Sequence, residues 1–417
     1  MAEFFNVLPP DQARALFLSH FVSLGDPEII ETTAALGRVT AGSVVAAHPL
    51  PEFRRSTMDG YAVRAANTFG ASEGLPAFLH VIGEVFMGQK ADVNLGMGQA
   101  AIVHTGGMIP STADAVVQIE HTQVVGHPAE DEFPFEIEVF RAVAAGQNIL
   151  QIGEDVSEGE EILPAGHRLR PQDLGGLLAV GMTRIRVARK PRVAIMATGD
   201  EIVPPDRSTL PGQIRDINSY TVAGQVANGG GVPINFGIVA DDFTSLQTAA
   251  SAALADSDML VMSAGSSVSV RDMTVEVIGS LGEPGVLFHG VATRPGKPTI
   301  VGVANEKPIL GLPGNPVSAM IQFDMLGVPA LYHLQGLLEK PLTRHMWVKL
   351  GQNIASESGR EDYIPARLED TSEGIMAWPV FGKSNLIFTL VGADGLIKVP
   401  LNSGGLLAGS MVEVRLF

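Results

Sequence analysis

The pattern of hydrophobic and polar positions divides the chain into a strand-rich part, a part in which strands and helices alternate, and a C-terminal part that is again rich in strands. Between about residues 78 and 162, short hydrophobic runs are broken by glycine, which is typical of an all-β region. From Pro191 to about residue 340, hydrophobic runs of strand length alternate with segments of helical periodicity. This alternation predicts a mostly parallel sheet with helices on both faces. From Pro341 onward, short β-runs return and predict a small β-domain.

The pattern also places individual elements. Near the N-terminus it predicts a helix over residues 9–21 and a second helix over residues 27–36, with Gly37 as its C-terminal stop. A helix and a strand are expected across residues 171–187. The mixed region is expected to contain strands over residues 191–201, 233–240, 258–267, 299–304 and 308–314, and helices over residues 219–231, 244–255, 272–282 and 316–334.

Composition and charge narrow the class of protein. A chain of 417 residues suggests two to four domains at roughly 150 residues each. The formal net charge of −17 argues against a nucleic-acid binder and against docking on an anionic membrane. The absence of cysteine excludes disulfides, a thiolate nucleophile and a cysteine zinc site. No uninterrupted apolar stretch is long enough for a membrane span, and no signal-peptide pattern opens the chain, so we expect a cytoplasmic protein.

Unusual loops follow three of the predicted strands, where open α/β sheets bind their ligands. Residues 197–201 (ATGDE) hold two carboxylates beside a glycine, which suits a metal or a polar ligand edge. Taken alone, however, this piece is better explained by an aspartate that caps a turn. Residues 262–272 hold small hydroxyl residues before a helix, a pattern that binds phosphate on backbone N–H groups. A flexible turn with Asp272 as helix N-cap explains them equally well.

The third of these loops, and one loop outside the three, each contain two prolines. In residues 311–318 (GLPGNPVS), Asn315 is a natural N-cap and Pro316 suits the first helical position. A well-capped turn explains these two residues, whereas a second proline before Gly314 suggests a stiff wall for a flat ring. Residues 294–298 (RPGKP) place two cations in a rigid turn, which suits anion capture. The commoner explanation for a short charge cluster is a solvated basic turn.

These loops, taken together with earlier ones, resemble the molybdopterin molybdenumtransferase family. The similarity extends from near residue 10 to the end of the chain, and the stretches STMDGYAV and GLPGNPVS are together highly specific. The matching segments are residues 56–63, 105–106, 113–120, 153–155, 198–201, 241–242, 263–272, 295–298, 311–318 and 393–396.

The resemblance implies an α/β plus β multidomain fold. It implies a central three-layer α/β molybdopterin-binding domain, an N-terminal β-rich domain and a small C-terminal β-domain. The implied division is residues 1–26 with 190–340 for the α/β domain, 27–45 with 160–189 for a linking domain, 46–159 for the β-rich domain and 341–417 for the C-terminal domain.

The resemblance also implies a function. Molybdenum would be inserted into adenylylated molybdopterin, giving molybdenum cofactor and AMP at the last step of cofactor synthesis. Molybdate and adenylylated molybdopterin would be the substrates and Mg²⁺ the cofactor. The protein would be a homodimer whose site lies between the α/β domain of one subunit and the β-rich domain of the other. Contact with the molybdopterin adenylyltransferase is a further expectation.

Site residues follow from the same resemblance, position by position. The implied catalytic residues are Asp59, Thr105, Glu201, Asp241, Asp272 and Arg294. The implied pterin-binding residues are Ser263, Gly265, Ser267, Ser269, Lys297, Pro313, Gly314, Asn315 and Pro316. The implied metal ligands are Asp59, Asp155, Glu201, Asp241 and Asp272.

The chain departs from the family pattern in its pterin loop. The usual loop reads Ser-Gly-Gly-Val-Ser-Val-Gly, and here Ala264, Ser266 and Ser269 replace Gly, Val and Gly. A second hypothesis is therefore a non-catalytic molybdopterin-binding or scaffold protein on the same fold. The retained carboxylates favour the enzyme. An unrelated nucleotide-binding enzyme is disfavoured because no Gly-x-Gly-x-x-Gly or Walker A loop is present.

Overall fold

The computed structural model describes residues 7–126, 133–264, 268–338, 344–372 and 374–417. The chain forms two compact units, the first made of Met1–Gly42, Ala165–Arg170 and Ile185–Phe417 and the second of Ser43–Pro164 and Pro171–Arg184. Each unit has hydrophobic cores of its own. The predicted α/β plus β fold class is confirmed. None of the described helices is long and apolar enough to cross a membrane.

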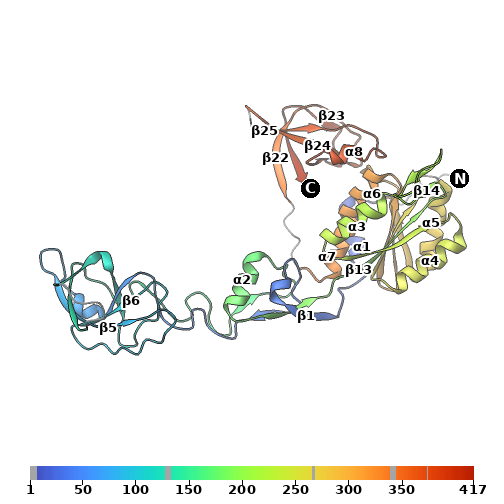
Figure 1. The fold of residues 1–417 in the computed structure, drawn as a ribbon. Helices are drawn as coiled ribbons and strands as arrows, with labels where there is room; N and C mark the ends of the chain where they lie inside the picture. Colours follow the sequence, from blue (N-terminus) through green and yellow to red (C-terminus); the bar gives the residue numbers. More distant parts are fainter. Residues whose placement is uncertain (1–6, 127–132, 265–267, 339–343, 373) are drawn as a thin grey trace. The chain divides into compact units, whose positions relative to one another are not determined.

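A six-stranded sheet forms the centre of the first unit (Figure 1). Its first four strands are mutually parallel, and the last two run antiparallel to their neighbours. The mostly parallel sheet expected from the sequence is therefore present. In spatial order the strands are β16 (Val232–Val239), β13 (Arg192–Thr198), β17 (Met259–Ala264), β21 (Lys307–Pro313), β20 (Ile300–Ala304) and β18 (Pro284–His289).

Helices cover both faces of this sheet (Figure 1). Successive residues of a strand point to opposite faces, and β13 shows the consequence. Val193 and Ile195 belong to one core, while Ala194 and Met196 belong to the other. The first core is covered by α1 (Pro10–Leu18), α3 (Asn218–Asn228), α6 (Pro316–Gln322) and α7 (Val328–Leu334), and the second by α4 (Phe243–Ala255) and α5 (Val268–Ser280).

The helix predicted over residues 316–334 contains a widened turn. The segment Phe323–Gly327 is a π-helix between α6 and α7, and Pro329 lies in the first turn of α7. Proline has no backbone N–H and therefore cannot donate to the carbonyl four residues earlier. The missing donor at Pro329 gives a physical reason for the local widening.

Two predictions about helices were wrong. Residues 27–36 form strand β1 (Pro27–Glu31) and a 3₁₀ turn (Thr32–Ala34) instead of a helix. This stretch is rich in β-branched residues, and β1 pairs with β12 (Arg184–Ala188), so a partner distant in sequence decided its structure. Helix α5 begins at Val268, so Asp272 lies inside the helix and is not its N-cap.

The C-terminal strands form a second six-stranded sheet in the first unit. Strand β24 pairs with both β25 and β26, so this sheet closes on itself. The short strand β19 (Thr293–Arg294) comes from the α/β region but pairs with the start of β24. The other members are β24 (Glu361–Thr371), β25 (Gly374–Pro379), β22 (His345–Leu350), β28 (Met411–Leu416) and β26 (Gly395–Val399).

The second unit is built on a third six-stranded sheet, as expected for the glycine-broken β-runs. The run over residues 114–125 forms two strands, because a 3₁₀ turn at Ile119–His121 separates them. Helix α2 (Pro171–Ala179) also belongs to this unit. The strand order is β7 (Ala115–Gln118), β4 (Gly60–Val63), β6 (Gln99–Val103), β5 (Ala77–Val85), β9 (Phe135–Val139) and β8 (Thr122–Val124).

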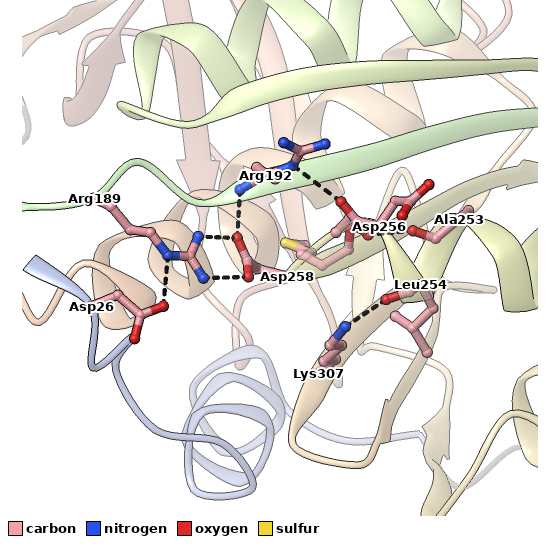
Figure 2. A network of polar contacts seen from close by, with 10 residues as sticks. Asp26, Arg189, Arg192, Ala253, Leu254, Asp256, Asp258 and Lys307 are labelled. Carbon is pink, nitrogen blue, oxygen red and sulfur yellow. Dashed lines mark hydrogen bonds and ion pairs between the residues drawn. The ribbon is translucent and has the colours of Figure 1, made fainter.

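An arginine–aspartate network fixes the amino ends of β13 and β17 (Figure 2). Arg189 donates two hydrogen bonds of 2.6 and 2.8 Å to the carboxylate of Asp258, and the backbone N–H of Arg192 donates a third at 2.8 Å. Burial raises the pKa of Asp258, but the bonds from Arg189 and Arg192 outweigh it and lower the pKa overall. This network anchors the sheet at the end opposite the predicted ligand loops.

Candidate functional site

The three strands that precede the predicted loops end at the carboxyl edge of the central sheet. Strands β13, β17 and β21 are parallel neighbours, so the segments that follow them leave the sheet at the same edge. The registers place Thr198 beside Ala264, and Ala264 beside Pro313. Sequence reasoning identified each loop separately, and the sheet order brings them together.

A side chain that sequence reasoning missed joins the end of β17 to the loop after β21. Asn218, the first residue of α3, donates from Nδ2 to the hydroxyl of Ser263 at 2.8 Å and to the carbonyl of Gly314 at 2.9 Å. Asn218 and Ser263 are both buried. The sequence signal was an asparagine at a helix start, which is normally explained as a cap.

Hydrogen bonds connect the end of β13 and the loop that follows it to the loop after β16. The Thr198 hydroxyl donates to Oδ1 of Asp241 at 2.5 Å, and the backbone N–H of Asp241 contacts Oδ1 of Asp200 at 3.4 Å. Glu201 is half-buried in the same loop. Asp241 and Glu201, two of the predicted catalytic residues, therefore belong to neighbouring loops at the carboxyl edge.

A cavity of about 830 Å³ opens between the loops that follow β19 and β21 and the C-terminal sheet. Four cationic side chains line it: Arg294, Lys297, Arg360 and Lys383. The predicted residues Pro313, Gly314 and Asn315 line it as well. In a chain of net charge −17, this local excess of positive charge makes the cavity a candidate anion site.

Asp362 pairs with two of the four cationic side chains that form the cationic wall of the cavity. Its carboxylate, buried at 3% exposure, accepts a 2.9 Å bond from Nε of Arg360 and lies 3.8 Å from Arg294. Arg360 also pairs with Glu357 at 2.8 Å, yet its Nη2 is buried and has no hydrogen-bond partner. Arg360 thus keeps one donor group for a further acceptor.

Close packing fixes the turn that carries Arg294 and Lys297. Gln322 donates to the hydroxyl of Thr293 at 2.9 Å and to the carbonyl of Pro295 at 3.2 Å. Gly296 has φ +99°, and a β-carbon there would lie 2.4 Å from Cγ of Gln322. Only glycine fits this place without displacing Gln322.

Asn315 and Pro316 begin α6 as predicted, but the Asn315 side chain does not cap the helix. Its Nδ2 donates instead to the hydroxyl of Ser384 at 2.9 Å, and the backbone N–H of Val317 donates to the Ser384 carbonyl at 3.1 Å. These bonds tie the 311–318 loop to the stretch Gly-Lys-Ser-Asn at residues 382–385. That stretch was a missed signal, because glycine followed by lysine and serine is a composition that binds anions.

In the second unit the structure brings Asp59 and Thr105 together. Oδ1 of Asp59 accepts bonds from the backbone N–H of Thr105 at 2.8 Å and from its hydroxyl at 3.2 Å. The backbone bond first, and then the hydroxyl bond, lower the pKa of Asp59 below its usual value. Both residues are exposed, and so is Asp155 in the same unit.

The other residues predicted for the site lie on α5 or outside the described residues. Asp272 is exposed on α5, and Ser269 lies in the first turn of that helix. Gly265 and Ser267 lie outside the described residues. Among the residues that the structure describes, no three histidine or carboxylate side chains are close enough together to hold a metal ion. Within the described part of the chain, the five predicted metal ligands therefore do not form a preformed metal site.

The fold and the cavity define a class of protein: a multidomain α/β protein with a cationic cavity, a candidate anion site, at the carboxyl edge of its central sheet. Comparison with known proteins agrees with this class. The chain matches the MoeA N-terminal region (domain I and II) over residues 8–181, the probable molybdopterin binding domain over residues 194–333 and the MoeA C-terminal region (domain IV) over residues 348–417.

Full-length relatives establish the family. The chain is 32% identical to the molybdopterin molybdenumtransferase of Bacillus subtilis, over 98% of this chain and 94% of the relative. The corresponding enzyme of Nostoc sp. is 33% identical, over 93% and 88%. A crystal structure of the molybdopterin biosynthesis MoeA protein from Pyrococcus horikoshii superposes with a TM-score of 0.85 at 31% identity, covering 99% and 100%. The chain belongs to the molybdopterin molybdenumtransferase family.

Proposed function

We propose that this protein inserts molybdenum into adenylylated molybdopterin, giving molybdenum cofactor and AMP. Its family membership makes it a transferase of molybdenum-cofactor biosynthesis. The structural observation that carries the proposal is the cavity with four cationic side chains in an otherwise acidic chain. Both substrates are anions, and their phosphate, dithiolene and oxyanion groups need such a local positive charge.

Molybdate is the substrate we assign to the cationic wall. Arg360 offers a buried N–H group without a partner, and Arg294, Lys297 and Lys383 surround the same cavity. Hydrogen bonds from charged donors to an oxyanion are among the strongest in proteins. The cavity volume of about 830 Å³ lies within the range of roughly 300–1,000 Å³ that is usual for ligand pockets.

The pterin is assigned to the loops after β17 and β21. Pro313, Gly314, Asn315 and Pro316 form one stiff wall, of which the first three line the cavity. Ser263 begins the hydroxyl-rich loop, and we assign Gly265, Ser267 and Ser269 to the pterin phosphate. Hydroxyl and backbone N–H donors in such a loop suit phosphate oxygens.

Magnesium is proposed as the cofactor, with the substrate completing its coordination. Mg²⁺ in phosphate-transfer sites is held by one or two carboxylates together with water and substrate phosphate. The described residues fit this arrangement, because Glu201 and Asp241 follow the neighbouring strands β13 and β16 and supply two carboxylates. Asp59, Asp155 and Asp272 are the other proposed ligands. When bound, Mg²⁺ would neutralise the charge of the phosphate link as it breaks.

The assembly we propose is a homodimer with a shared site. Asp59 and Thr105 of one subunit would complete the site formed by Glu201, Asp241, Asp272 and Arg294 of the other. We also propose the four-domain division given by the family resemblance, a cytoplasmic location, and contact with the molybdopterin adenylyltransferase that would supply the substrate.

The test is AMP release from adenylylated molybdopterin by the purified protein with Mg²⁺, measured with and without molybdate. Molybdate-dependent AMP release is the expected result. Tight binding of the pterin nucleotide without AMP release would instead support the binding or scaffold role, which the altered residues Ala264, Ser266 and Ser269 suggest. Failure to bind the nucleotide at all would overturn both functions.

A further inference from the structure

Asn218 makes contacts that the proposed function does not use. It is 7% exposed and lies between the end of β17 and the loop after β21, where its Nδ2 donates to the Ser263 hydroxyl and to the Gly314 carbonyl. One side chain therefore connects the end of β17 with the loop after β21.

The orientation of this amide is fixed by its surroundings. A carbonyl oxygen can only accept hydrogen bonds, so the Asn218 atom that faces Gly314 must be the NH₂ group. The amide oxygen is left buried without a hydrogen-bond partner. An unpaired buried acceptor costs free energy, so this position is not optimised for stability alone.

The bond to Gly314 also orients the next N–H group. In a planar trans peptide, the carbonyl and the following N–H point in opposite directions. Because the Gly314 carbonyl is directed at Asn218 on α3, the N–H of Asn315 is directed away from α3. Gly314 and Asn315 both line the cationic cavity. Ser263 is only 2% exposed and accepts a 2.8 Å hydrogen bond from Asn218. A buried partner of this kind fixes the position of the Asn218 side chain.

We propose that Asn218 is a positioning residue of the substrate site. Anchored by Ser263, it holds the Gly314–Asn315 peptide so that the Asn315 N–H serves as a hydrogen-bond donor to an anionic group of the substrate. Ser263 then contributes to substrate binding through Asn218. This inference rests on the proposed function, since it requires an anionic substrate in the cavity.

A matched control lies on the same helix. Gln225 donates from Nε2 to the carbonyl of Met320 at 2.9 Å, and its Oε1 is buried without a partner. It resembles Asn218 in its bonding, but its partner is on α6 and not in a ligand loop. Asn218→Ala and Gln225→Ala therefore both remove a half-satisfied amide from α3, and only the first is expected to release a ligand loop.

The experiment measures the Kd of metal-free adenylylated molybdopterin by titration calorimetry, together with thermal unfolding of each variant. We expect Asn218→Ala to weaken binding roughly 10- to 100-fold, the loss typical of a well-placed hydrogen bond to a charged group. Gln225→Ala is expected to lower the melting temperature similarly while its Kd stays within about twofold of the wild type. Equal affinity losses in the two variants, or wild-type affinity in Asn218→Ala, would overturn the inference.

A double-mutant cycle tests the role of Ser263. If Ser263 acts through Asn218, Ser263→Ala combined with Asn218→Ala binds no more weakly than Asn218→Ala alone, whereas additive losses contradict this relay. Should Asn218→Ala fail to fold, the isosteric Asn218→Asp replaces it. A carboxylate accepts from Ser263 but cannot donate to Gly314, so the same loss of affinity is expected, and unchanged affinity would refute the role of the donor. A wild-type protein that binds no nucleotide would refute the proposed function itself.

Discussion

At Gly296 the missing side chain decides whether the cationic turn can form. The backbone has φ +99°, and a β-carbon would lie 2.4 Å from Cγ and 2.5 Å from Nε2 of the buried Gln322. Gln322 in turn bonds to Thr293 and to the Pro295 carbonyl. The positions of Arg294 and Lys297 in the cavity therefore depend on the neighbouring Gly296.

We predict that Gly296→Ala reduces molybdate-dependent AMP release and destabilises the fold by about 1–3 kcal/mol, the usual cost of a strained backbone position. Chemical denaturation measures the stability. Gly359→Ala is the matched control, because Gly359 has φ +96° but no atoms within 4 Å of the added carbon. If the two variants lose equal stability and activity, then backbone strain alone explains the effect and the Gln322 contact is unimportant.

A substitution at Lys383 tests whether the cationic side chains of the cavity bind molybdate, and it leaves the buried carboxylate of Asp362 paired. It is exposed and lines the cavity, whereas Arg360 also holds the buried Asp362. We predict that Lys383→Met raises the KM for molybdate about tenfold, since one charged donor to the oxyanion is lost. Lys349→Met, which removes an exposed cation of β22 outside the cavity, should leave the KM unchanged. An unchanged KM in Lys383→Met would remove this residue from the molybdate site.

At the scale of elements, the amino ends of β13 and β17 are held by charge. Asp258 accepts two bonds from Arg189 and one from the backbone of Arg192 (Figure 2), and its pKa is lowered in the folded state. A carboxyl group whose pKa is lowered by folding stabilises the protein above its unfolded pKa. That stability is lost as the pH falls through the lowered pKa.

We predict that Asp258→Asn lowers the free energy of unfolding at pH 7 by about 2 kcal/mol, the range for hydrogen bonds to charged groups. The difference between variant and wild type should shrink as the pH falls below the ordinary aspartate value of 3.8. Urea denaturation across this pH range is the measurement. Asp256→Asn is the control, since Asp256 contributes only its backbone carbonyl to Arg192. A constant difference at all pH values would contradict the assignment.

The whole molecule offers the test of a shared active site. If the site combines Asp59 of one subunit with Asp272 of the other, a mixed dimer of Asp59→Ala and Asp272→Ala subunits contains one intact site. Random mixing of the two inactive variants should then restore about a quarter of the wild-type turnover, as symmetry requires for a two-fold dimer.

The control for subunit mixing pairs Asp59→Ala with Thr105→Ala. These residues lie in the same unit and bond to each other, so every site of their mixed dimer carries one defect. No activity should return in this mixture. Recovery in both mixtures, or in neither, would contradict a site shared between subunits. AMP release after mixing and refolding gives the readout, and size-exclusion chromatography verifies that dimers are present.

Local patterns in the sequence were sufficient for much of the fold. The strand β13 and helix α4 followed from hydrophobic periodicity, and the glycine-broken runs gave the strands of the second unit. Residues 27–36 were mistaken for a helix, because periodicity alone cannot reveal that β1 pairs with β12. The π-helical turn before Pro329 was also missed, although the proline that removes a backbone donor is visible in the sequence.

The sequence by itself determined the family, the fold class and the loops that carry Glu201, Ser263 and Asn315, because these depend on local spacing and composition. Only the tertiary structure placed Arg360, Lys383 and Asn218 at the same site, since they come from segments far apart in the chain. Tertiary contacts also turned Asn315 from a helix cap into a partner of Ser384. The physical reason is that the hydrogen-bond partners of a side chain depend on which residues pack against it. The local pattern of hydrophobic and polar residues does not specify that packing.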